Sequence, residues 1–119
     1  MNINEYIQKY RENGLFTPAI RCRDGFTMSV QASRAHYCSP RKDGNQTYHS
    51  VEVGYPSVLE EILMEYKEGT GISTDSVYPC VPVYKVDALI MKHGGMLVPC
   101  ELRDEEFVIE EQTTRFGES

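Results

Sequence analysis

The chain has 119 residues, of which 12 are Lys or Arg and 18 are Asp or Glu, so its formal net charge is −6. A chain of this length suits a single domain with one modest core. The acidic total argues against a general nucleic-acid binder, because the binding surface of such proteins is basic. No apolar run is long enough to span a membrane, and no signal-peptide pattern opens the sequence. We therefore expect a cytoplasmic protein.

The charge is unevenly distributed along the chain. Seven acidic and two basic residues lie in 101–119, which we interpret as an acidic C-terminal extension to one domain formed by residues 1–100. Within the extension, 105–112 fits an edge strand or a helix, and the last residues fit a disordered tail. In contrast, 20–55 contains five basic and three acidic residues. This local excess suits a small anionic ligand or an acidic partner surface, and equally a solvated sheet edge.

The predicted elements begin with a helix over 3–13, where apolar side chains recur with helical spacing. Asn2 and Glu5 fit a capping box at the start of this helix. A short strand at 19–22 follows, and the Arg-Asp-Gly run at 23–25 predicts a hairpin turn.

Two further strands are predicted at 26–33 and 47–54, because apolar and polar side chains alternate in both ranges. Such strands bury one face and leave the other polar. This alternation places Tyr48 on the polar face of the second strand.

A second helix is predicted over 57–67, where Ser57 and Glu60 fit another capping box. A strand at 77–81 then leads to a third helix that starts at Pro82, a residue suited to the first helical position. An edge strand at 96–100 completes the core of the chain. The expected class is α+β, a small antiparallel sheet with about three helices packed on one face.

The stretch 28–41 combines hydroxyl, amide, imidazole, phenol, thiol and guanidinium groups. Guanidinium forks and hydroxyls bind anions, and Tyr or His rings stack on planar groups. These groups predict a small anionic, nucleotide-like ligand, although Ser and Gln also suit a strand face that is merely solvated. The candidate ligand-binding residues are Arg21, Arg23, Ser29, Gln31, Ser33, His36, Tyr37, Arg41 and Tyr48.

No motif of the common nucleotide hydrolases, zinc proteases or serine hydrolases is present. We therefore expect a binding protein that needs no cofactor and is not an enzyme. Two alternatives stay open. His36 precedes Cys38 by two residues, which fits an activated thiolate if both lie on one strand face. Cys22, Cys38, His36 and His49 are suitable zinc ligands without a standard spacing. Otherwise the cysteines fit reduced thiols.

Three runs carry a resemblance: DGFTMSVQASRAHYCSPR, YHSVEVGYPSVLEEILMEYKE and TDSVYPCVPVYKVDALIMKHGG. Over about residues 20–95, the chain resembles a group of small uncharacterised phage and prophage proteins of gut and other Gram-positive bacteria. The resemblance implies a phage accessory protein rather than a housekeeping enzyme. It assigns no catalytic residue.

In a phage setting, such a protein acts by binding in the host cytoplasm. We expect a homo-oligomer that binds a small anionic nucleotide-like ligand and sequesters a signal of host immunity. One alternative is an inhibitor that covers a host defence protein with its acidic surface. The other is a Cys38-dependent enzyme. Neither a membrane nor nucleic acid in general is an expected partner.

Overall fold

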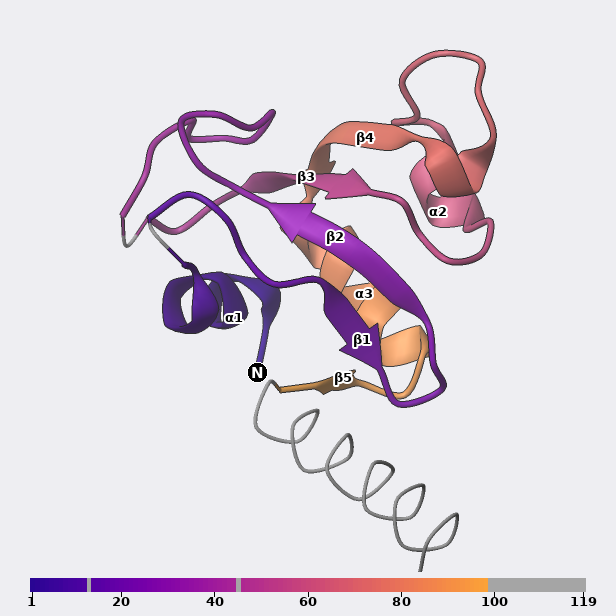
Figure 1. Ribbon diagram of the computed structural model, residues 1–119, viewed down its shortest axis with the longest axis horizontal. Helices are drawn as coiled ribbons and strands as arrows, with labels where there is room; N and C mark the ends of the chain where they lie inside the picture. Colours follow the sequence, from indigo (N-terminus) through magenta and orange to yellow (C-terminus); the bar gives the residue numbers. More distant parts are fainter. Residues whose placement is uncertain (13, 45, 99–119) are drawn as a thin grey trace, which may run out of the picture.

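Five strands form one antiparallel sheet in the order β4-β3-β2-β1-β5 (Figure 1). The computed structural model describes residues 1–12, 14–44 and 46–98. The elements are α1 (Ile3–Tyr10), β1 (Ile20–Cys22), β2 (Thr27–Gln31), β3 (Ser50–Gly54), α2 (Glu61–Met64), the short 3-10 helix η1 (Ser73–Asp75), β4 (Val77–Pro82), α3 (Val83–Lys92) and β5 (Met96–Leu97). The expected α+β class with an antiparallel sheet is confirmed.

The pairing of β2 with β3 determines which side chains enter the core. Val30 lies opposite Val53, and Gln31 lies opposite Glu52. Because successive side chains of a strand point to opposite faces, one face of this pair is apolar and the other is polar. The buried set is Met28, Val30, Val51 and Val53, each 1% exposed or less. The alternation predicted for both strands is therefore confirmed over β2 and β3.

Helices α1 and α3 supply the other half of the core. Their buried side chains join those of the sheet in one cluster; they are Ile3, Tyr6 and Ile7 from α1 and Val86, Leu89 and Ile90 from α3. In Figure 1, α3 lies behind the sheet, and none of the described helices crosses in front of it. Within the described ranges, no helix has the length and apolar character needed to cross a membrane.

Helix α2 is shorter than predicted, and the capping box expected at Ser57 is wrong. The N-cap of α2 is Glu60, and it makes no side-chain cap hydrogen bond. Ser57 instead continues the pairing with β2: its N–H donates to Thr27 O (2.8 Å), and its Oγ accepts from Thr27 N–H (3.0 Å). The Glu60 carboxylate accepts a hydrogen bond from Lys92 Nζ and lies within hydrogen-bond distance of His93 Nε2. The side chains of Ser57 and Glu60, which the local pattern assigns to a helix cap, therefore make long-range contacts instead.

Tyr48 lies in the core and not on the polar strand face predicted for it. β3 begins only at Ser50, so Tyr48 belongs to the preceding loop and is free of the strand alternation. The Asn4 side chain accepts from Tyr48 N–H (2.8 Å) and donates to Tyr48 O (3.0 Å), which ties this loop to α1. The ring is 1% exposed, and its hydroxyl donates to Lys42 O (2.5 Å).

The other elements agree with the sequence pattern. The predicted capping box of Asn2 and Glu5 is present, although α1 ends at Tyr10. The strand predicted at 77–81 is β4, and Pro82 is the N-cap of α3 rather than its first residue. β5 lies at the edge of the sheet beside β1. The acidic extension at 101–119 lies outside the described residues.

Replacing Leu89 with Ala should lower the free energy of unfolding by about 2–5 kcal/mol, because its side chain is buried in the core shared by α3 and the sheet. Met91 lies on the same helix but is 79% exposed, so Met91→Ala should change stability by less than about 0.5 kcal/mol. Urea unfolding curves with equal slopes measure both values. Equal losses in the two variants would contradict this packing.

Candidate functional site

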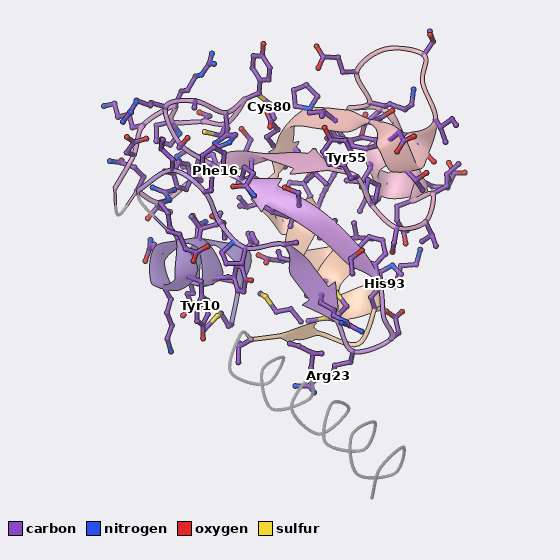
Figure 2. The ribbon with its side chains drawn as sticks, in the orientation of Figure 1. Tyr10, Phe16, Arg23, Tyr55, Cys80 and His93 are labelled. Atoms are coloured by element: carbon purple, nitrogen blue, oxygen red, sulfur yellow. The ribbon has the colours of Figure 1, made fainter. Side chains whose placement is uncertain are left out.

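The nine predicted ligand-binding residues do not form one site. Ser33, His36 and Tyr48 are buried. Arg21, Ser29 and Gln31 lie on the polar face of the sheet. Tyr37 and Arg41 lie together in the loop between β2 and β3, and Arg23 lies at the other end of the molecule, beyond β1 (Figure 2).

Ser33 and His36 form a buried pair that shapes the loop. Ser33 Oγ lies 2.7 Å from His36 Nδ1, and it accepts from Ala35 N–H at 3.0 Å. The His36 ring meets the Phe16 ring edge-on, with 5.4 Å between their centroids. Ser33 is fully buried, so its hydroxyl cannot reach a substrate and serves the fold rather than a hydrolytic reaction.

Polar side chains of β2 also make hydrogen bonds within the protein. Gln31 Oε1 accepts from Thr17 N–H, and Gln31 Nε2 donates to Thr17 O, both at 2.8 Å. The same Nε2 lies 3.0 Å from Ser29 Oγ. Gln31 thus holds the segment before β1 against the sheet, which makes it a structural residue. Arg21 stays exposed, opposite Thr27 in the β1–β2 register.

Tyr37 and Arg41 form an exposed stacked pair. The Arg41 guanidinium carbon lies 5.0 Å from the centroid of the Tyr37 ring, whose residue is 48% exposed. The backbone of Tyr37 is held on both sides, because its N–H donates to Glu52 Oε2 (3.1 Å) and its carbonyl accepts from Cys80 N–H (3.1 Å). Arg41 Nε donates to Arg34 O (3.2 Å). Tyr37 is therefore anchored at its backbone and Arg41 at its Nε, while the Tyr37 ring is exposed.

Two guanidinium groups act on the buried part of this loop. Burial is the main cause that lowers the pKa of His36, and the charges of Arg11 and Arg41 act in the same direction, against an opposing effect of Glu52. Burial also raises the pKa of Cys38, while the charges of Arg11 and Arg41 oppose that shift. The charges of Arg11 and Arg41 therefore act on both buried groups of the loop, and at His36 the carboxylates of Glu52 and Asp43 oppose them.

Arg11 is a supporting residue that the sequence pattern did not reveal. It caps the C-terminus of α1, and its guanidinium donates to Gly44 O (3.2 Å), to Ala32 O and to the Tyr48 hydroxyl (2.7 Å). These acceptors are uncharged, and Arg11 makes no ion pair among the described residues. Its partners lie 21 to 37 residues further along the chain, so no local spacing predicts the contact.

His93 is the second residue whose role sequence reasoning missed. It is the C-cap of α3. However, its two ring nitrogens also meet Asp24 and Glu60, which lie 69 and 33 residues earlier. Lys92 joins the same cluster through Glu60. Only the folded chain brings these charged groups together.

The groove that Arg23 lines is distant from the stacked pair. Its volume is about 570 Å³, and its walls are largely apolar. Asp87 also lines it, and burial raises the pKa of this carboxyl, which accepts from Ile3 N–H at 2.8 Å. Arg23 therefore belongs to a different surface from Tyr37 and Arg41.

The contacts of Cys38 argue against a catalytic thiol. Its single S–H is shared between Ser33 O (3.3 Å) and Pro40 O (3.4 Å). The thiolate alternative needs His36 as the activating base, but His36 Nδ1 lies 2.7 Å from Ser33 Oγ instead. Burial keeps the thiol protonated by raising its pKa. The zinc alternative also lacks support, since no three His, Cys, Asp or Glu side chains in the described part of the chain are arranged to hold a metal ion.

Comparisons with protein-family models, curated proteins and solved structures found no match for this chain. The functional interpretation therefore rests on the residues and their geometry.

The thiols of the folded protein should differ strongly in reactivity. In a Cys100→Ser background, Cys80 should be alkylated first because it is exposed, while Cys22 and Cys38 are buried. Burial raises the pKa of Cys22 from 9.0 to about 11, which lowers its thiolate fraction about a hundredfold near neutral pH. Peptide mass mapping after brief alkylation measures the order. Rapid labelling of Cys38 would contradict it and restore the nucleophile hypothesis.

Proposed function

We propose that this protein is a non-enzymatic binding protein for a small anionic molecule with a planar ring, such as a nucleotide. The observation that carries this function is the exposed pair of Tyr37 and Arg41, in which the Tyr37 backbone is held by β3 and β4. A preformed aromatic face beside a guanidinium offers the two groups that a base and a phosphate require. Little ordering of these backbone segments is then needed when the ligand binds.

The free groups of the pair define the binding mode. Arg41 uses only Nε within the described residues, so its terminal nitrogens are available to a phosphate. The Tyr37 ring offers a stacking face for a base, either beside Arg41 or after the guanidinium moves aside. Arg34, next in the loop, pairs with Asp43, and the backbone N–H and guanidinium of Arg34 lower the pKa of that carboxyl. The local negative charge is thereby neutralised.

The buried residues of the predicted set have a supporting role in this function. Ser33 and His36 shape the loop through their mutual contact, and Tyr48 fixes its far end to α1. We assign ligand contact to Tyr37 and Arg41 and loop shape to the other three. Sequestration of a nucleotide signal of host immunity by a phage-encoded homo-oligomer is the biological role that the sequence resemblance favours.

The first test is a thermal-shift screen of the purified protein against mono-, di- and cyclic nucleotides. A ligand that binds only the folded state at a hundredfold excess over its dissociation constant adds about 2.7 kcal/mol of stability. We expect one nucleotide class to raise the melting temperature. No shift with any class would contradict the proposal and favour inhibition of a protein partner.

For the nucleotide that binds, Arg41→Ala should weaken affinity by about 1.5–3 kcal/mol through loss of charge-assisted hydrogen bonds. Tyr37→Ala should cost about 1–3 kcal/mol of stacking. Calorimetric titration measures both. Tyr84→Ala is the matched control, because Tyr84 is an exposed tyrosine (68%) on α3.

Arg21→Ala distinguishes the loop from the polar sheet face. We expect its affinity to equal that of the unmodified protein. Loss of binding in Arg21→Ala with normal binding in Arg41→Ala would place the site on the sheet and contradict the assignment to the loop.

A further inference from the structure

Three separate parts of the chain meet at the His93 side chain, at the opposite end of the sheet from the loop of Tyr37 (Figure 2). His93 itself ends α3. Its Nδ1 lies 2.6 Å from Asp24 Oδ2 in the β1–β2 turn, and its Nε2 lies 2.5 Å from Glu60 Oε1 at the start of α2. The ring stacks on Phe26 with centroids 4.0 Å apart and planes 6° apart.

The proton count at this ring follows from its partners. An ionised carboxylate only accepts hydrogen bonds, and a neutral imidazole carries a single N–H. Both ring nitrogens face carboxyl oxygens at hydrogen-bond distance. Because the pKa values of Asp24 and Glu60 are lowered, both carboxyls are ionised near neutral pH, and both ring nitrogens then donate. His93 is therefore an imidazolium in this arrangement, held between two acids.

The charges of the four groups bonded in this cluster balance in that state, and the Arg23 side chain lies beside the following Gly94 and Gly95. Asp24 and Glu60 are the acids, and Lys92 is the other base, with its Nζ 2.7 Å from Glu60 Oε2. The Glu60 side chain is 2% exposed, whereas that of Lys92 is 64% exposed. Loss of the His93 proton would leave a ring lone pair facing a carboxylate. Among the described residues, the buried Glu60 would then have Lys92 as its only cationic partner. That arrangement is repulsive and poorly solvated.

The three parts joined by His93 also enclose a cavity of about 260 Å³, lined by Asp24, Gly25, Phe26, Ser57, Val58 and His93. One wall comes from the β1–β2 turn and the start of β2, and the other from the segment that leads into α2. Because His93 bonds to Asp24 on one side and to Glu60 on the other, its bonds fix the relative position of the two walls of this open cavity.

We propose that His93 is a proton-operated clamp, which joins the β1–β2 turn, the start of α2 and the end of α3 while its ring is charged and loses one of its two carboxylate bonds when the ring loses its proton. This device goes beyond the ligand site at Tyr37 and Arg41 and shares no residue with it. Its direct consequence is that the position of the cavity walls depends on pH.

The direction of the pH dependence follows from each group. Burial alone would lower the pKa of His93, but its bonds to Asp24 and Glu60 outweigh burial and raise it. The clamp therefore stabilises the fold fully below the unfolded pKa of about 6.5, and this contribution is lost as pH rises through the higher folded value. The pKa of Asp24 is lowered by the Phe26 N–H and by His93. Burial raises the pKa of Glu60, but bonds from Lys92 and His93 give a net lowering.

Because the pKa values of both carboxyls are lowered in the folded protein, the two carboxylates stabilise the fold at pH values above the ordinary carboxyl pKa. This stabilisation is lost as pH falls through their folded pKa values. The clamp should therefore hold between the carboxyl titrations in acid and the His93 titration above about pH 6.5.

NMR titration of the histidine ring protons in the full-length protein tests the clamp. The chain has three histidines, and His→Gln variants assign their signals. We expect the His93 midpoint to lie above the ordinary value of about 6.5, and the His36 midpoint to lie below it because that ring is buried. Backbone amide shifts of Gly25, Ser57 and Glu60 should follow the His93 midpoint.

Glu60→Gln provides the decisive variant. It keeps the shape of the side chain and its hydrogen-bond acceptor but removes the charge, so the His93 midpoint should fall while the protein stays folded. His49→Gln, at an exposed histidine, should change neither the midpoint nor the amide shifts. A His93 titration midpoint at or below the ordinary histidine pKa would overturn the proposal. Amide shifts at Gly25 and Ser57 that do not change at the His93 midpoint would also overturn it.

Discussion

The register of β2 against β3 is the constraint on which the rest of the structure depends. Val30 opposite Val53 commits the alternate residues of both strands to the core. A shift by one residue would exchange the two faces and carry Ser29 and Gln31 inward. With this register in place, α1 and α3 have one apolar face to cover. The loop that leaves β2 and returns to β3 also has two fixed ends.

That loop takes its shape from side chains outside it. Arg11 bonds it from the end of α1, Asn4 holds Tyr48, and Glu52 of β3 accepts from Tyr37 N–H. These contacts provide hydrogen-bond partners for backbone groups of the loop, while an aromatic ring and a guanidinium stay at the surface. Structural support and ligand contact are thus divided between different residues of one loop, so a surface substitution at Arg41 need not disturb the core.

Local patterns predicted the fold well and the site only in part. Alternation in β2 and β3 and the helical stripe of α1 are properties of neighbouring residues, so the sequence reveals them. The errors arose where distant partners compete: Ser57 pairs with Thr27 instead of capping α2, and Tyr48 enters the core through Asn4. The Asp24–His93–Glu60 cluster joins residues up to 69 positions apart, and no spacing rule finds it.

The most direct test of the central claim is amide and guanidinium NMR mapping of the protein with the nucleotide that stabilises it. The account predicts that shift changes concentrate at 34–42 and at the Arg41 Nε–H, with little change at Gly25 or Ser57 beside the His93 clamp. Changes confined to the groove beside Arg23, or to the polar face of β2, would contradict it. The exposed pair of Tyr37 and Arg41 would then be a surface feature without a ligand.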